Sequence, residues 1–182
     1  MANTPSAKVS LSITGRDVIT SGGKAGVVPT FLQQQLELSN GLNDGQIDLL
    51  YYTRAENVAA STITSYDLSG VLFDEEGTTL LFSEIALIYL YNRRTTALAY
   101  LDIGPHATNG FGRLASSKGF WPADIAADAD QGSIVAPSSF GLWYSKVGVP
   151  VTAGTGDILR VTTSAVTGSS NAWDILILGR SS

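Results

Sequence analysis

Apolar residues alternate most clearly near the C-terminus of the chain. Trp173, Ile175 and Ile177 fall on one face of an extended segment. Leu176 and Leu178 fall on the opposite face, so both faces are apolar and both require cover. The pattern predicts a central strand of a β-sheet that is packed on both sides.

The segment just before this one has a different pattern. Leu159 and Val161 lie on one face, whereas Arg160 and Thr162 lie on the other, which is typical of a strand with one side in water. Between the two segments, residues 166–171 supply the Gly and short polar residues that favour a chain reversal. The sequence therefore predicts an antiparallel hairpin that ends the protein in the middle of its core.

Strand patterns recur along the rest of the chain. In residues 31–38, Leu32, Leu36 and Leu38 share one face and polar residues occupy the other. About eight such segments with short turns and almost no helix predict an all-β fold of two antiparallel sheets packed as a sandwich. The strands expected before the terminal hairpin are 31–38, 46–54, 57–64, 85–91, 97–103, 134–136 and 140–144.

The most apolar run, residues 78–91, fits two structures, because its spacing also suits one face of a helix. We favour a short turn up to Glu84 and a buried strand from Ile85 to Tyr91, since aromatic and β-branched residues dominate there. Residues 92–96 would then close a hairpin onto 97–103. A continuous helix is the alternative.

The first thirty residues are rich in Gly, Ser and Thr and contain only short alternating runs, 9–13 and 17–20. We interpret residues 1–30 as an extended arm that pairs at the edge of a sheet, its own or a neighbour's, and that serves as a possible attachment segment. A frayed terminus is the alternative. Residues 31–182 are expected to form the sandwich as one domain.

Composition narrows the possible partners. With 44% hydrophobic and 15% charged residues, the chain is apolar for a small soluble monomer, so some apolar surface is expected to meet other subunits. The net charge is −5 and no basic cluster exceeds Arg93-Arg94, which argues against nucleic acid. The chain has no cysteine and no stretch near the roughly 18 apolar residues that span a bilayer. Residues 1–8 lack a basic region followed by an apolar run, so no secretion signal is expected. No membrane partner is expected.

The segment from Pro105 to Ala136 lacks a steady period and is long for a loop. It carries Phe111, Phe120 and Trp121, which as exposed rings would anchor a neighbouring subunit or stack against a sugar. In the alternative, they fold back and cap an open end of the sandwich.

Candidate chemical sites are few. A cupin-type metal site needs two or three imidazoles, and His106 is the only histidine, expected on a surface loop. Asp128 and Asp130 alternate as in a calcium loop, and Asp124 lies one helical turn earlier, but the bidentate Glu expected further on does not follow. We therefore expect an acidic solvated loop, with ion binding as the alternative. No catalytic residue, metal or cofactor is predicted.

Several motifs together carry a family resemblance. They are Asp67–Gly70, Asp74 and Gly77, Ile85–Asn92, Leu101–Gly104, Val151–Arg160 and Asp174–Gly179. In this order they resemble small virion proteins of tailed bacteriophages, whose jelly-roll domains decorate or cement the capsid or form head-fibre and tail-appendage parts. The resemblance covers roughly residues 35–182, and each motif alone is turn chemistry open to any β-sandwich.

The resemblance implies an antiparallel jelly roll that forms a homotrimer and binds the major capsid protein or other virion proteins. Such a protein resides in the virion after synthesis in the host cytoplasm. The expected function is that of a capsid decoration or cement protein, not an enzyme, which self-associates and binds the shell through buried apolar surface. The alternative is a receptor- or glycan-binding module of a phage fibre or tail appendage.

Overall fold

The computed structural model describes residues 5–21, 24–112, 119–121, 132–165 and 171–182. Within these ranges the chain forms strands and turns without a helix, which confirms the all-β prediction, and no helix that could cross a membrane occurs there. The strands are β1 Ala7–Ser21, β2 Lys24–Asn40, β3 Gln46–Ile47, β4 Leu49–Val58, β5 Ile63–Asp67, β6 Leu72–Phe73, β7 Thr79–Leu80, β8 Glu84–Asn92, β9 Leu101–Pro105, β10 Ser133–Val135, β11 Phe140–Pro150, β12 Ile158–Thr163 and β13 Asn171–Arg180.

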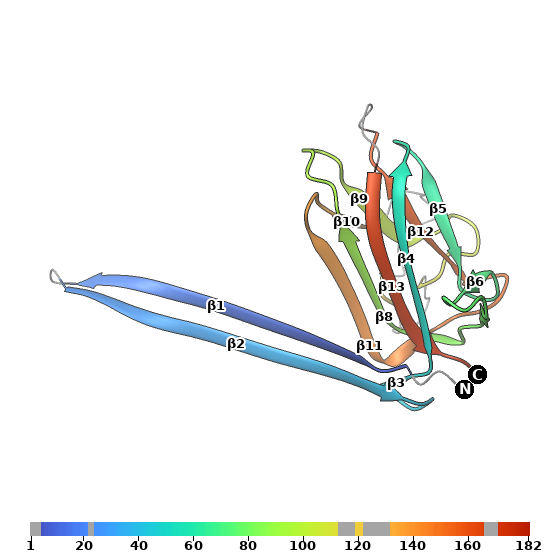
Figure 1. Ribbon diagram of the computed structural model, residues 1–182, viewed down its shortest axis with the longest axis horizontal. Coiled ribbons are helices and arrows are strands. Elements are labelled where there is room, and N and C mark those ends of the chain that lie inside the picture. Colours follow the sequence, from blue (N-terminus) through green and yellow to red (C-terminus); the bar gives the residue numbers. More distant parts are fainter. Residues whose placement is uncertain (1–4, 22–23, 113–118, 122–131, 166–170) are drawn as a thin grey trace.

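Two four-stranded antiparallel sheets lie face to face (Figure 1). The front sheet has the strand order β11-β8-β13-β4, and the back sheet has the order β10-β9-β12-β5. Ile88 and Ile175 of the front sheet share one core cluster with Leu101 and Leu159 of the back sheet. Two layers packed around one core form a β-sandwich.

The two strongest apolar segments lie where their patterns predict. β13 is paired on both sides, to β8 and to β4, which confirms the central strand. β8 spans the expected strand from Ile85 to Tyr91, so the helix alternative for this run is wrong. Trp173 and Ile177 of β13 are fully buried in the core, as is Ile88 of β8.

The predicted terminal hairpin is wrong, because β12 and β13 belong to different sheets. β12 pairs with β5 and β9, whereas β13 pairs with β4 and β8. Residues that face each other across a sandwich core alternate just as residues on neighbouring strands do. The alternation of Leu159 and Val161 therefore predicted a strand correctly and its partner incorrectly.

The predicted hairpin between residues 85–91 and 97–103 is wrong for the same reason. β8 lies in the front sheet, and β9, which begins at Leu101, lies in the back sheet. Between them the backbone of Leu98 has a φ of +68°. Asn92 is fully buried at the crossing and donates its side-chain amide to the carbonyl oxygens of Ala99 and Val135, which ties the crossing segment to the back sheet.

β12 was expected to expose Arg160 to water, but only 2% of that side chain is accessible. β12 lies between β9 and β5, and the Arg160 guanidinium donates hydrogen bonds to groups of the same sheet. Its Nε donates to the Pro105 carbonyl oxygen at 2.9 Å, and Nη2 donates to Asp102 at 3.0 Å. A buried guanidinium is tolerated when its donors are paired in this way.

The N-terminal arm is a two-stranded antiparallel ribbon of β1 and β2. Its register runs from Ala7 opposite Leu38 to Ser21 opposite Lys24. The ribbon projects away from the two sheets (Figure 1). The expected boundary between residues 30 and 31 falls inside β2, so residues 31–38 belong to the ribbon and are not the first strand of the sandwich.

Candidate interaction surface

The outer face of the front sheet is the candidate functional site. Residues that alternate outward on its four strands align across the sheet in three rows. The row nearest the ribbon is Leu50, Leu178, Leu87 and Tyr144; the middle row is Tyr52, Leu176, Tyr89 and Leu142; the far row is Arg54, Asp174, Tyr91 and Phe140. We call these twelve residues the outer face.

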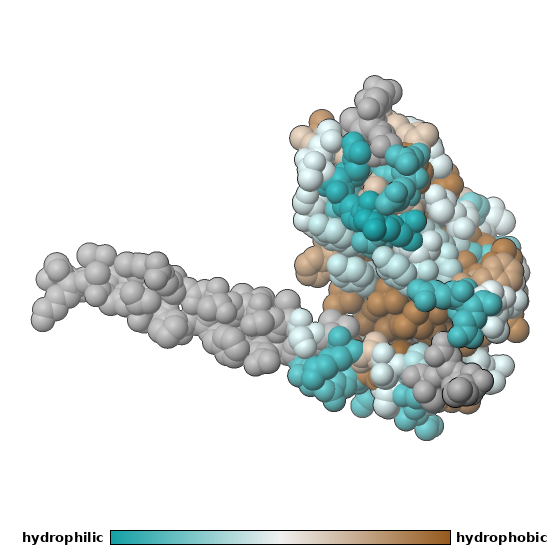
Figure 2. All heavy atoms as spheres, in the orientation of Figure 1, coloured by the Kyte–Doolittle hydropathy of each residue, from teal (hydrophilic) through white to brown (hydrophobic). Residues whose placement is uncertain are grey.

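Large apolar side chains of the outer face are accessible to solvent. Phe140 is 58% exposed, Tyr52 46%, Leu142 42%, Tyr144 40% and Leu50 36%. Single exposed apolar residues are ordinary on a protein surface, but adjacent ones that form a patch mark an interaction site. Phe140, Leu142 and Tyr144 lie on the edge strand β11, and Leu50 and Tyr52 lie on the opposite edge strand β4. The half-buried Tyr89 and Leu176 on the two central strands connect them into one patch. Figure 2 shows a hydrophobic area beside the base of the ribbon.

The base of the ribbon covers the end of the outer face that lies nearest to it. Leu38 of β2 is 2% exposed and belongs to one buried cluster with Leu87 and Leu178 of the outer face. Ala7 and Leu36 pack against the same cluster. The ribbon thus begins by packing on the outer face and then leaves it.

A charged cluster includes Arg54 and Asp174 of the far row and continues past it at the end of the outer face opposite the ribbon. Arg93 Nη2 lies 3.0 Å from Glu56 Oε1, and Arg54 Nε lies 3.1 Å from the same oxygen. Asp174 completes the cluster, at 3.5 Å from Arg93. Burial raises the pKa of the Tyr89 phenol next to this cluster, and the Asp174 carboxylate raises it further. Charged residues of this kind form the rim of an apolar interface.

Arg180, at the end of β13, holds the base of the ribbon against the sandwich. Its side chain is 2% exposed, and its Nε donates to Glu84 Oε2 at 2.8 Å. Nη1 donates to the Asn43 carbonyl oxygen at 2.8 Å, in the turn that follows the ribbon. Nη2 donates to the Val147 carbonyl oxygen at 2.6 Å, beside the irregular register of β11. One guanidinium therefore connects three segments that lie far apart in the sequence.

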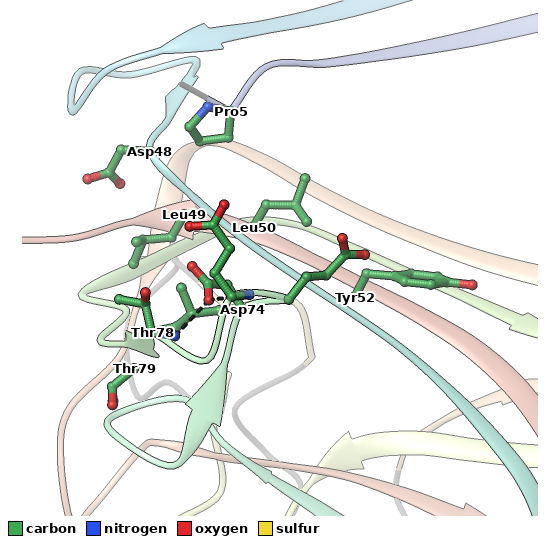
Figure 3. A pocket seen from close by; sticks show the side chains of 11 residues that line it. Pro5, Asp48, Leu49, Leu50, Tyr52, Asp74, Thr78 and Thr79 are labelled. Carbon is green, nitrogen blue, oxygen red and sulfur yellow. Dashed lines mark hydrogen bonds between the residues drawn. The ribbon is translucent and has the colours of Figure 1, made fainter. Parts of the chain in front are cut away.

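A cavity of about 520 Å³ lies beside the ribbon base, between the start of β4 and the β6–β7 turn (Figure 3). Leu50 and Tyr52 of the outer face line it together with acidic residues. Asp74 accepts the backbone N–H of Thr78 at 2.7 Å, and Asp48 accepts a backbone N–H of the C-terminal segment at 2.8 Å. Because the cavity shares Leu50 and Tyr52 with the outer face, we regard it as a continuation of that face.

The aromatic residues of the long segment do not form an exposed platform. Phe111 is 0% and Trp121 5% exposed, and Phe120 is partly buried against them. Trp121 Nε1 donates to the Ser133 hydroxyl at 3.2 Å, and its ring lies 6.1 Å from that of Trp143. The structure corrects the expected exposure of these rings and places them where the capping alternative put them, because they bury more apolar area in the core than they could at a loop tip.

The other candidate residues have ordinary surroundings or lie outside the description. His106 is in a turn in which its Nδ1 lies 3.1 Å from the backbone nitrogen of Thr108. Asp124, Asp128 and Asp130 fall in the range 122–131, outside the described residues. Among the residues that are described, no group of three or more His, Cys, Asp or Glu side chains could hold a metal ion.

The chain matches no protein-family model, no curated protein and no solved structure. The surface itself is therefore the basis for a functional interpretation. The sequence partly predicted this surface, because Leu176 and Leu178 indicated a second apolar face on the terminal strand. The role of Arg180 had no such signal, because its partners come from Glu84, Asn43 and Val147.

Proposed function

We propose that this protein is a structural virion protein of a tailed bacteriophage, a capsid decoration or cement protein that acts by adhesion. It self-associates, with a homotrimer as the expected assembly, and binds the major capsid protein or another virion protein after synthesis in the host cytoplasm. The proposal joins the family resemblance of the sequence to the apolar outer face of the front sheet.

The order of the strands supports a jelly roll. When the eight sandwich strands from β4 to β13, without β6 and β7, are numbered one to eight along the chain, the front sheet runs 6-3-8-1 and the back sheet runs 5-4-7-2. Two interleaved Greek keys produce this order, and jelly rolls of this kind build viral capsid and lectin domains. A fold of this class hosts many functions, so the strand order supports the fold and not the role.

The observation that carries the proposed role is the apolar patch on the outer face. Phe140, Leu142 and Tyr144 of β11 and Tyr52 of β4 are each at least 40% exposed in one chain. Burial of apolar area stabilises association by roughly 25 cal/mol for each Å² removed from water. Adhesion of this kind needs area and shape and no reacting group, so we assign no catalytic residue.

The first experiment measures the assembly state. Sedimentation velocity at several protein concentrations is expected to show an oligomer for the natural protein and a monomer, or at least weaker association, for Leu142→Lys. Ile134→Lys is the matched control, because Ile134 is 69% exposed on β10 of the back sheet, outside the outer face. A concentration-independent monomer for the natural protein would contradict self-association.

The second experiment concerns the particle. Reconstruction of a phage particle that carries this protein is expected to place it on the shell in symmetric clusters. The virion role would be disproved if purified protein failed to bind shells that lack it. The receptor- or glycan-binding alternative relied on an exposed Trp121, and with Trp121 in the core no observation favours it.

A further inference from the structure

The ribbon has one apolar and one polar face over the half nearest the sandwich. Its register sets Val9 opposite Leu36 and Ile13 opposite Leu32. Directly paired residues of an antiparallel ladder lie on the same face, and the face changes at each step along a strand. The apolar positions of both strands therefore share the face of Leu38, together with Gln34 opposite Leu11. Ser10, Ser12, Gln33 and Gln35 occupy the other face.

Among the described strands, β1 pairs only with β2, and β2 pairs otherwise only with β3, at Ser39 and Asn40. The cluster at the ribbon base includes Leu36 and Leu38. Beyond them the ribbon runs away from its own sandwich (Figure 1). A two-stranded ribbon alone is marginally stable in water, so a ribbon of this length requires a surface to pack on.

The outer face is the surface that matches it. Within one chain the ribbon already packs on the outer face through Leu38, which contacts the cluster of Leu87 and Leu178. The outer face continues past this contact with Tyr52 and Leu142, which are 46% and 42% exposed. The apolar face of the ribbon packs on the outer face at the ribbon base, but the two faces cannot meet further along one chain, because the ribbon diverges from the sheet (Figure 1).

The dimensions allow the contact between chains. β1 has 15 residues, which at about 3.4 Å per residue gives a ribbon of about 50 Å. β13 has 10 residues, or about 34 Å, and four strands at about 4.8 Å spacing measure less than about 20 Å across. The apolar half of the ribbon, about 25 Å long, therefore matches the width of the four strands in the outer face of another copy.

We propose that the β1–β2 ribbon of one copy lies with its apolar face on the outer face of a second copy, so that each chain donates one ribbon and accepts one. This inference rests on the proposed self-association and names its contact. A donor surface that differs from the acceptor surface forms a head-to-tail interface, which closes into a ring such as a trimer when the rotation allows it.

Site-directed disulfide formation tests this contact, because the chain has no cysteine of its own. One chain carries Leu11→Cys in the ribbon, and a second, distinguished by a tag, carries Leu142→Cys on the outer face. The two are mixed, equilibrated and oxidised with copper phenanthroline. A disulfide between the two different chains is expected. Ser12→Cys in place of Leu11→Cys is the matched control, one residue away on the polar face, and is expected to cross-link far less.

A second pair of variants measures the strength of the contact. Leu11→Lys combined with Ile13→Lys is expected to raise the dissociation constant of the assembly by about tenfold or more, because two buried apolar positions become charged. Ser10→Lys combined with Ser12→Lys adds the same charge to the polar face and is expected to change it little. Circular dichroism and the melting temperature show that each variant keeps the sandwich.

The outcomes separate this inference from the proposed function. Oligomers that persist unchanged in the Leu11→Lys and Ile13→Lys protein, with no disulfide between Leu11→Cys and Leu142→Cys chains, would overturn ribbon exchange and leave self-association intact. Disulfides between two Leu11→Cys chains without the mixed product would show that ribbons pair with ribbons and would also overturn it. A natural protein that is monomeric at every concentration would overturn both.

Discussion

Arg180 and Asn43 are joined across the base of the ribbon. Arg180 Nη1 donates a hydrogen bond of 2.8 Å to the Asn43 carbonyl oxygen, while Nε of the same side chain donates to Glu84. Because β13 is one of the two central strands of the front sheet, this contact joins the turn after the ribbon to the middle of that sheet. The anchoring of the ribbon base thus depends in part on one buried guanidinium, beside the packing of Leu38 on the outer face.

Replacement of Arg180 tests that dependence. Arg180→Met is expected to lower the free energy of unfolding by about 3 kcal/mol, because the carbonyl groups of Asn43 and Val147 lose a charged donor and Glu84 loses its partner. Urea denaturation followed by tryptophan fluorescence measures the change. Arg54→Met is the control, since Arg54 is 58% exposed and its ion pairs are expected to contribute less than about 1 kcal/mol. Equal losses in the two variants would contradict this role of Arg180.

Gly148 gives a second test of the same contact. Its φ is +79°, and a Cβ there would meet Arg180 and Glu84, whereas Gly77, with a φ of +82°, has open space around it. Gly148→Ala and Gly77→Ala each place an alanine at a positive φ, which costs about 1–2 kcal/mol of backbone strain. Gly148→Ala is expected to lower the free energy of unfolding more than Gly77→Ala. The difference measures the steric clash of the added Cβ with Arg180. Thermal denaturation of the two variants measures it, and equal melting temperatures would argue against the crowding.

Tyr66 and Trp173 connect the two sheets, and the burial of the Tyr66 phenol makes stability depend on alkaline pH. Trp173 Nε1 donates to the Tyr66 hydroxyl at 3.0 Å inside the core. Burial raises the pKa of Tyr66 above its ordinary value of 10.0, because the phenolate would lose its hydration. The pKa of Tyr66 is higher in the folded than in the unfolded state, so the stability contributed by its buried neutral phenol is fully present below pH 10. That contribution is lost as the pH rises above 10 and through the folded-state pKa.

Tyr66→Phe is therefore expected to have two effects. At neutral pH it lowers the free energy of unfolding by about 1–3 kcal/mol, because the Trp173 N–H stays buried without an acceptor. Above about pH 10 the stability of the variant falls less steeply than that of the natural protein. Urea titrations at several pH values measure both effects. Tyr100→Phe, at a residue that is 40% exposed, is the control at neutral pH. Parallel pH curves would disprove the linkage.

Trp121 is expected to act on stability and not on binding. Trp121→Ala should lower the free energy of unfolding by about 3–5 kcal/mol, since it removes a ring that is only 5% exposed and packs against Trp143. Phe140→Ala is the contrasting variant, because Phe140 is 58% exposed on the outer face. It should weaken self-association and leave the melting temperature nearly unchanged. Calorimetry measures the stability of both proteins, and sedimentation measures their association. If Trp121→Ala weakened association and Phe140→Ala lowered the melting temperature, the assignment of the two rings would be wrong.

Much of the fold could be predicted where the signal lies within a single strand. The alternation of Trp173, Ile175 and Ile177 marked a core face, and the aromatic and β-branched run from Ile85 marked a buried strand. Each pattern reflects the period of two residues along an extended chain, which needs no knowledge of distant residues. The apolar character of Leu176 likewise indicated that the outer face needs cover.

The sequence by itself determined strands such as β8 and β13 and their core faces, because alternation is a local property. The strand expected at 57–64 is wrong, since residues 59–62 lie between β4 and β5. Only the tertiary structure decided that β12 and β13 lie in opposite sheets, that the N-terminal segment folds into a ribbon that includes residues 31–38, and that Arg160 and Arg180 are buried. Those features depend on which strands pair and on which carbonyls lie near a guanidinium. Strands and side-chain partners that are tens of residues apart in the sequence meet only when the whole core forms. The alternation within one strand is the same whichever strand it pairs with, so it cannot predict these partners.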